Sequence, residues 1–234
     1  MIEARGLGYR YGDVTVLDGV DLTIDDGEAV AIVGPNGSGK TTLVRTFDAL
    51  LEPDAGTVAV DGHDVTEHPV LARTRVGMVF QHPRDQFVAA TVGADVAFGP
   101  ENLGLDRDEI DRRVEAALAA VGMSGRADER VDELSGGEQA RVAIAGVLAM
   151  DPDHLVLDEP LAGLDRDARR RVLARLDDLS AAGTSLIVVT HDLSDLVDRL
   201  DRIVGLVDGS VAFEGPPAEV LSALEDVGVT DPRC

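Results

Sequence analysis

The fold of this chain is decided by two adjoining pieces of sequence, Ala-Val-Ala-Ile-Val at residues 29–33 and Gly-Pro-Asn-Gly-Ser-Gly-Lys-Thr-Thr at residues 34–42. The apolar run is typical of a buried strand, and the second piece matches the phosphate-binding pattern G-x-x-x-x-G-K-[ST]. Glycines let the backbone of such a turn curve so that successive N–H groups point at one anion. The sequence therefore predicts a strand, then a phosphate-binding loop, then a helix.

Individual residues of this loop have separate predicted roles. Lys40, the only lysine in the chain, would reach the β- and γ-phosphates, and Thr41 would offer a hydroxyl to Mg²⁺. The helix that follows would point its partially positive N-terminus at the anion. Apolar residues at helical spacing after the loop are Leu43, Phe47, Leu50 and Leu51. We expect the phosphates to be bound by Gly34, Pro35, Asn36, Gly37, Ser38, Gly39, Lys40, Thr41 and Thr42.

Length and composition favour one intracellular unit. A chain of 234 residues suits a single core, with or without a smaller subdomain. No apolar run approaches the length needed to cross a bilayer, and residues 1–5 do not resemble a signal peptide. The single cysteine, Cys234, cannot form an intrachain disulfide, which fits a reducing, cytosolic compartment. We expect a protein that is soluble or peripheral to a membrane.

The charge is strongly acidic. The net charge is −23, and arginine replaces lysine almost everywhere. Such a surface argues against binding to nucleic-acid phosphates. The same balance also suits a protein that must stay soluble in a very salty cytoplasm, and we favour this halophilic interpretation as a hypothesis.

The segments on either side of the loop read as strands. Residues 1–30 alternate short β-type runs with turns and predict a small antiparallel sheet, which residues 57–62 could join. Residues 75–80 predict a further strand that ends at Gln81. Tyr11 is predicted to lie in a turn, where its ring could stack on a nucleotide base or could simply be an ordinary half-buried tyrosine.

Residues 82 to about 150 change to helical character. Asp106 with Glu109, and Ser135 with Glu138, have the spacing of a capping box at the start of an apolar-striped helix. Taken alone, the second pair marks only a well-capped helix. Two glycines at residues 136–137 nevertheless leave bare N–H groups in its first turn, which suits a second phosphate contact.

Acidic residues follow a second apolar strand. Residues 155–157 are typical of a buried parallel strand that delivers Asp158 and Glu159 to the edge where open α/β sheets bind ligands. Asp158 could hold Mg²⁺ and Glu159 could orient an attacking water. Asp165 is placed to cap the next helix. After the strand at residues 186–189, His191 could contact a γ-phosphate or be a satisfied structural histidine.

In combination these features resemble the ATP-binding-cassette ATPases over nearly the whole chain, up to about Leu221. The resemblance rests on Tyr11, the phosphate loop, Gln81, the signature Leu134–Gln139, residues 155–159, Asp165 and His191, all in the family's order. It implies an α/β fold with a RecA-like parallel-sheet core, an antiparallel β subdomain and an inserted helical subdomain. The whole of residues 1–234 would form one domain, with the core and β subdomain at 1–81 and 151–221 and the helical subdomain at about 82–150.

The same resemblance implies a mechanism. In this family two cassettes pack head to tail, so that ATP held by the loop of one is covered by the signature helix of the other. Carried onto this chain, Tyr11 would stack on adenine, Thr41, Gln81 and Asp158 would arrange Mg²⁺, and Lys40, Glu159 and His191 would act at the γ-phosphate. The opposite subunit would contribute Ser135, Gly136, Gly137 and Glu138, and Asp165 would couple the two sites. This context favours the functional roles of Tyr11 and His191.

A narrower resemblance covers residues 76–87 and 91–104, which look like the ATPase subunit of energy-coupling-factor importers for cobalt, nickel, biotin and other vitamins. The departures include His82 in place of the usual Asn and Leu161-Ala162 before the loop that ends in Asp165. The resemblance implies a peripheral ATPase at the cytoplasmic face of the cell membrane. Its partners would be a second cassette, either a copy or a related one, a transmembrane coupling subunit and a small membrane substrate-binding subunit.

The sequence disfavours two other functions. A soluble cassette acting on ribosomes or DNA is disfavoured by the single cassette, the lack of a zinc-binding cysteine set or a long heptad insertion, and the lack of a basic face. A regulatory clamp that binds ATP without turnover is disfavoured by the intact Glu159 and His191.

The halophilic hypothesis predicts that folding and activity depend on salt. At low ionic strength the acidic surface repels itself, and concentrated KCl screens that repulsion. We expect the thermal unfolding midpoint and the ATPase rate to fall steeply as KCl is lowered from the molar range to about 0.1 M. Full folding and activity at the low concentration would contradict the hypothesis.

Overall fold

Two β-sheets organise the computed structural model, which describes residues 1–229; Cys234 and the end of the predicted domain lie outside the described residues. The strands are β1 (Ile2–Tyr11), β2 (Val14–Ile24), β3 (Ala29–Val33), β4 (Ala55–Val60), β5 (His63–Asp64), β6 (Val76–Val79), β7 (His154–Asp158), β8 (Ser185–Val189), β9 (Arg202–Val207) and β10 (Ser210–Gly215). The helices are α1 (Lys40–Phe47), α2 (Pro69–Arg75), α3 (Val92–Asn102), α4 (Arg107–Ala120), α5 (Gly136–Met150), α6 (Arg166–Ala181) and α7 (Pro217–Val220).

The larger sheet sets the position of the site. Its strand order is β10-β9-β3-β8-β7-β6, and all neighbours are parallel except the β9–β10 hairpin. Asp158 at the end of β7 is paired with Val189 at the end of β8. The residues that follow β3, β7 and β8 therefore leave the sheet at one edge, which is where parallel α/β sheets bind ligands.

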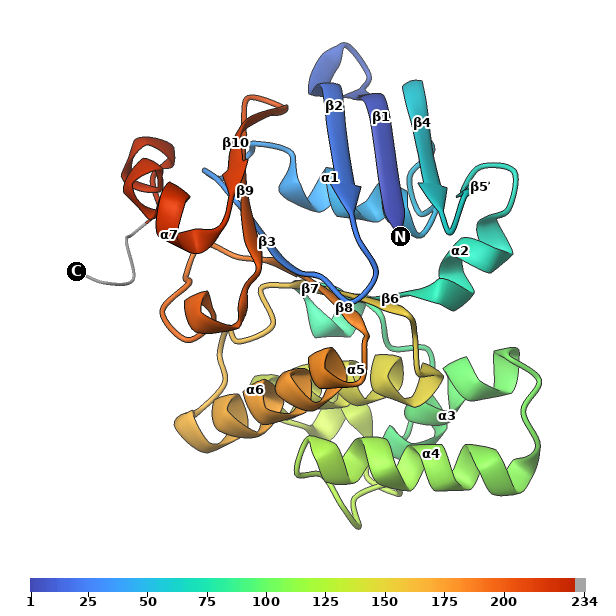
Figure 1. The fold of residues 1–234 in the computed structure, drawn as a ribbon. Coiled ribbons are helices and arrows are strands. Elements are labelled where there is room, and N and C mark those ends of the chain that lie inside the picture. The colour runs from blue at the N-terminus through green and yellow to red at the C-terminus, as the bar shows by residue number, and fades with distance from the viewer. Residues whose placement is uncertain (230–234) are drawn as a thin grey trace.

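A smaller antiparallel sheet of order β2-β1-β4-β5 packs above the larger one, with α1 between them (Figure 1). Helices α3 to α6 cover the opposite face of the larger sheet. Side chains of β7 alternate between the two layers: Leu155 and Leu157 pack with the helices, and Val156 packs toward α1 and the smaller sheet. A strand buried on both faces needs apolar residues at every position, which explains the continuous apolar runs in the sequence. The predicted α/β fold class is confirmed.

Three local predictions need correction. Tyr11 is the last residue of β1 rather than a turn residue, because the chain reverses at residues 12–13. Helix α1 ends at Phe47, so Leu50 and Leu51 lie beyond it; the Asp48 side chain accepts the Leu50 N–H at 3.2 Å and so competes with continuation of the helix.

The third correction concerns the cap of α4. Asp106 accepts the Glu109 N–H at 2.9 Å as expected, but the Glu109 carboxylate binds the guanidinium groups of Arg112 and Arg113 instead of completing a capping box. At Ser135 and Glu138 both halves of the capping box are present. Among residues 1–229, no helix combines the length and the apolar character required to cross a bilayer.

The buried carboxyl group of Asp48 predicts a pH dependence. Asp48 is only 6% exposed, and burial raises its pKa from an ordinary 3.8 to about 6, against the lowering effect of the Leu50 N–H. The folded state therefore holds a proton that the unfolded chain has lost, so this group makes the free energy of unfolding fall as pH rises from about 4 to about 6.

Asp48→Asn keeps an acceptor for Leu50 and removes the titration. We expect this variant to be more stable than the parent by about 3 kcal/mol above pH 6 and to show no such gain below pH 4. Denaturant unfolding of both proteins at fixed KCl across this range measures the difference. A stability difference that is independent of pH would contradict the prediction.

Candidate nucleotide-binding site

The loop between β3 and α1 passes unusually close to other backbone. Gly34 has φ +148°, and a Cβ atom there would lie 2.0 Å from the Leu206 carbonyl oxygen of β9. Gly39 has φ +100°, and a Cβ atom there would lie 2.8 Å from the Val16 carbonyl oxygen of β2. Both positions therefore require glycine, and the loop is held between β9 and β2 with its N–H groups available to an anion.

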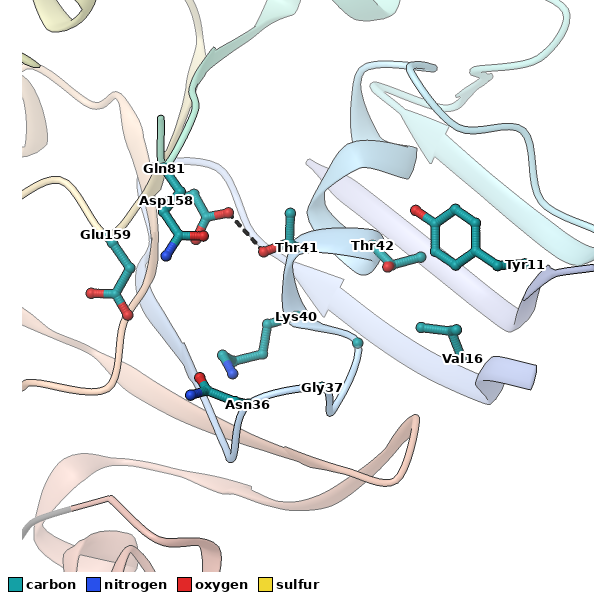
Figure 2. A pocket seen from close by; sticks show the side chains of 11 residues that line it. Tyr11, Val16, Asn36, Gly37, Lys40, Thr41, Thr42, Gln81, Asp158 and Glu159 are labelled. Atoms are coloured by element: carbon teal, nitrogen blue, oxygen red, sulfur yellow. Dashed lines mark hydrogen bonds between the residues drawn. The ribbon is translucent and has the colours of Figure 1, made fainter. Parts of the chain in front are cut away.

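The loop forms the floor of a cleft of about 410 Å³. The cleft collects residues from the end of β1, the start of β2, the loop and α1, and the ends of β6 and β7 (Figure 2). Its lining residues are Tyr11, Val16, Asn36, Gly37, Gly39, Lys40, Thr41, Thr42, Gln81, Asp158 and Glu159. The fold thus brings together most of the residues that the sequence predicted for the phosphates and for Mg²⁺.

Lys40 is held by its own loop. Its Nζ donates to the carbonyl oxygens of Gly34 and Pro35, each at 2.9 Å. Burial lowers the pKa of the Lys40 ammonium, and the nearby carboxylates of Glu159 and Asp158 oppose that shift. The ammonium is therefore a desolvated positive charge at the mouth of the loop, where it can bind a phosphate oxygen strongly.

The Ser38 side chain is buried within the loop. Its hydroxyl is buried and has no hydrogen-bond partner among the described residues. Buried polar atoms without a partner are rare, because leaving one unpaired costs free energy. The hydroxyl lies on the side of the loop that packs against β9, 3.0 Å from the point where a Gly34 Cβ atom would stand, and Ser38 is not among the residues that line the cleft.

Three side chains that carry possible metal-ligand oxygens line the cleft with Lys40. The Thr41 hydroxyl donates to Asp158 Oδ2 at 2.8 Å, and Gln81 lines the same cleft (Figure 2). Burial raises the pKa of the Asp158 carboxyl, the Thr41 hydrogen bond lowers it, and the neighbouring Glu159 carboxylate raises it further. Hydroxyl, amide and carboxylate oxygens are the ligands that Mg²⁺ prefers, and a cation here would offset the cost of burying Asp158. The donor set therefore fits the metal.

Glu159 and His191 form a pair that the sequence did not show as one unit. The ring nitrogen His191 Nδ1 lies 2.6 Å from Glu159 Oε1. The backbone N–H of His191 donates to the same oxygen at 3.1 Å. Thr190 Oγ1 donates to Glu159 Oε2 at 3.1 Å. Glu159 itself has a left-handed backbone, φ 53°, which places a carboxylate that is only 14% exposed in this corner.

Thr190 was not predicted as a site residue. The available signal was its position directly after β8, since parallel neighbouring strands end at the same edge. Val16 was also missed. It lies with Tyr11 at the end of the cleft away from Glu159 (Figure 2). Tyr11 is 49% exposed, and its ring stands edge-on to Tyr9 with 5.0 Å between the ring centroids.

The signature residues do not join this cleft within the described chain. Ser135 and Gly136 are exposed at the start of α5, and Gly136 lines a neighbouring cleft of about 370 Å³ that shares Gln81, Asp158 and Glu159 with the first. The Glu138 carboxylate accepts the Ser135 N–H at 2.8 Å and binds Arg126 at 2.5 Å. These contacts lower the pKa of Glu138 to about 2, so it is an anion fixed against its own helix.

Asp165 is likewise engaged at a helix start, where its carboxylate accepts the Ala168 N–H at 2.8 Å as the cap of α6. The predicted cap is therefore present. Arg126 was missed by the sequence analysis because nothing in its local pattern indicates a contact with Glu138.

Sequence comparisons place this architecture among known proteins. Residues 17–162 match the family model described as ABC transporter. An ABC transporter ATP-binding protein of Halobacterium salinarum is 62% identical over 232 residues, which cover 99% of this chain and 100% of that protein. The energy-coupling factor transporter ATP-binding protein EcfA of Methanocaldococcus jannaschii is 43% identical over 231 residues, covering 97% of this chain and 83% of that protein.

Structural comparisons agree. CbiO1 of Clostridium perfringens, part of the ABC transporter complex CbiONQ, superposes with a TM-score of 0.82 at 35% identity, covering 99% of this chain and 96% of that chain. A dimeric ATP-binding cassette in a post-hydrolysis state with ADP and Pi superposes with a TM-score of 0.84 at 29% identity, covering 93% of this chain and 99% of that chain.

Proposed function

Since this chain belongs to the ABC transporter family of ATP-binding proteins, we propose that it is the ATP-hydrolysing subunit of an energy-coupling-factor importer, powering uptake of a metal ion or vitamin. The observation that carries the ATPase part is the meeting of the loop, the Thr41–Asp158 pair and the Glu159–His191 pair at one edge of the sheet. Similarity to EcfA along nearly the whole chain, and to CbiO1 of the CbiONQ complex, supports the importer part.

Each residue of the cleft has a role in this proposal. The loop N–H groups and Lys40 bind the phosphates, with Lys40 exchanging the carbonyls of Gly34 and Pro35 for phosphate oxygens. Tyr11 stacks on the adenine, with Val16 beside it. Thr41, Gln81 and Asp158 would hold Mg²⁺, which neutralises charge on the β- and γ-phosphates when bound.

Glu159 orients and polarises the water molecule that attacks the γ-phosphate. For this the carboxylate must be fixed, and the hydrogen bonds from Thr190 and His191 fix it from two sides. His191 is 70% exposed while its Nδ1 is directed at Glu159, so the ring supports the carboxylate and remains accessible to the γ-phosphate. In this proposal, the phosphate loop, Glu159 and His191 supply the groups needed for hydrolysis once a second cassette closes the site.

Closure is proposed to come from a second cassette. The signature residues are the exposed Ser135 and Gly136, the half-buried Gly137, and Glu138, which fixes the start of their helix. They lie outside the lining of the Lys40 cleft of the same chain. A head-to-tail partner would therefore supply them, with Asp165 at the contact. The partner is another copy of this chain or a related cassette. The dimeric state of the similar cassette with ADP and Pi supports this arrangement.

The membrane contact is proposed at the helical subdomain, at about residues 82–150. Val88 and Phe98, on the segment after Gln81 and on α3, are exposed apolar side chains at 61% and 46%. Single exposed apolar residues are common, but two on adjoining segments suit a cytoplasmic helix of a transmembrane coupling subunit. The chain would then be peripheral at the cytoplasmic face, with a small membrane substrate-binding subunit completing the importer. Action on ribosomes or DNA is disfavoured by the net charge of −23.

Glu159→Gln tests the catalytic assignment. The amide keeps the shape of the side chain but is a poor base, so we expect ATP binding to persist, turnover to fall by at least about a hundredfold, and closed dimers to accumulate. Turnover assays and light scattering under saturating ATP measure both effects. Lys40→Ala is the matched control, since it should lose ATP binding and dimers as well as turnover. Glu159→Gln that remains monomeric with ATP would contradict the two-cassette model.

Affinity purification from detergent-solubilised membranes at high KCl tests the importer assignment. We expect a polytopic coupling subunit and a small hydrophobic subunit to copurify with the tagged chain. Val88→Asp should abolish their recovery, because a charge would be buried at the contact, whereas Val70→Asp, at a 76% exposed position on α2, should not. Recovery of ribosomal or DNA-bound proteins without membrane subunits would overturn the transport role and leave the ATPase standing.

A further inference from the structure

One side-chain amide connects the end of β6 to α5. Gln86 Oε1 accepts the Phe80 N–H at 3.0 Å, and Gln86 Nε2 donates to the Ala143 carbonyl oxygen at 3.3 Å. Phe80 immediately precedes Gln81, which lines the nucleotide cleft. A neutral amide is both donor and acceptor, so a single residue can bind both elements at once.

A second side-chain contact lies on the same face of α5. Arg84 Nε donates to Gln139 Oε1 at 3.0 Å, and Gln139 Nε2 donates to the Val131 carbonyl oxygen at 3.0 Å. Gln139 is 4% exposed, so this amide is buried, and both its oxygen and its nitrogen are hydrogen-bonded. Gln139 and Ala143 are four residues apart and therefore share one face of the helix, the face turned to residues 83–86.

Backbone bonds within the intervening segment are local. The Asp85 N–H donates to His82 O, and the Gln86 N–H donates to Pro83 O, so this turn is bonded only to itself through these groups. The side-chain hydrogen bonds that join it to α5 come from Gln86 and Arg84. Because α5 begins at Gly136, these bonds lie between Gln81 in the cleft and the exposed signature residues.

We propose that Gln86 is a positioning residue that makes the end of β6, which carries Gln81, and helix α5, which carries the signature, move as one unit. This inference rests on the proposed function, in which Gln81 contacts the bound Mg²⁺ and nucleotide and the signature contacts the nucleotide of a second cassette. A shift of Gln81 on nucleotide binding would then be transmitted through the Gln86 amide to the surface that α5 presents to its partner. Arg84 supports the same link through Gln139.

Two substitutions separate the bonds of the amide. Gln86→Glu keeps an oxygen that can accept the Phe80 N–H but places its second oxygen against the Ala143 carbonyl. Gln86→Leu removes both hydrogen bonds with a side chain of similar size. The control is Asn102→Ala, which removes an exposed amide at the last residue of α3 that makes no side-chain hydrogen bond within the described part of the chain. Each change is made in the Glu159→Gln protein for dimer measurements and in the parent for turnover.

We expect both Gln86 variants to need up to about tenfold more ATP for half-maximal dimer formation. We also expect their kcat to fall by up to about tenfold. The affinity of the single chain for a fluorescent ATP analogue should stay within about twofold of the parent, because the loop and Tyr11 are untouched. The thermal unfolding midpoint of both variants should fall somewhat, because the Ala143 carbonyl, and in Gln86→Leu also the Phe80 N–H, loses its partner. The measurement that separates coupling from a purely structural role is therefore single-chain ATP affinity, which a structural defect would lower together with dimer formation and turnover.

Hydrogen exchange gives a readout that needs neither hydrolysis nor a dimer. On addition of Mg²⁺ and ATP at a chain concentration too low for dimers, we expect residues 80–87 and 136–144 of the parent to gain protection together. In Gln86→Leu only the first segment should respond. This inference alone would be overturned if the Gln86 variants formed dimers and turned over ATP as the control does. It would also be overturned if residues 80–87 and 136–144 still gained protection together in Gln86→Leu. A parent chain that neither binds nor hydrolyses ATP would overturn the proposed function itself.

Discussion

The close contact between the Gly34 backbone and the Leu206 carbonyl of β9 is the constraint on which the rest of the site depends. No side chain fits there, because a Cβ atom would stand 2.0 Å from that oxygen. The loop is also bonded to the β9–β10 hairpin, since the Gly209 N–H donates to Ser38 O at 3.2 Å. The phosphate loop is therefore shaped by the strands around it, and its residues Asn36, Gly37, Gly39 and Lys40 line the cleft.

Charges of opposite sign meet at the phosphate loop. In a chain with a net charge of −23, the only lysine lies at the loop, beside Asp158 and Glu159 at the same sheet edge. Burial works against both the Lys40 ammonium and the Asp158 carboxylate, which lowers the pKa of one and raises the pKa of the other. A site with these buried, opposed charges is poised for a ligand that carries both phosphate and a divalent cation.

Helix α5 connects the two halves of the proposed mechanism. Its first turn is fixed by the Ser135–Glu138 capping box and by Arg126, and its next turns are fixed to the segment after β6 by Gln139 and Ala143. Its apolar side packs into the large cluster shared with β7 and β8. The same helix is thus contacted from its first turn to its last, which is what the proposed coupling between Gln81 and the signature requires.

Local patterns determined a large part of this protein without any structure. The apolar runs predicted β3, β7 and β8, the Ser135–Glu138 and Asp165 caps predicted the starts of α5 and α6, and the glycine-rich turn predicted the phosphate loop. These features depend on residues within a few positions of one another, and for that reason the sequence alone reveals them. Only the tertiary structure decided which distant residues meet: Thr41 with Asp158 across 117 positions, Glu159 with His191, Arg126 with Glu138, and Gln86 with both Phe80 and Ala143. Those contacts follow from strand order and from the packing of α5 on the sheet, which no local spacing encodes.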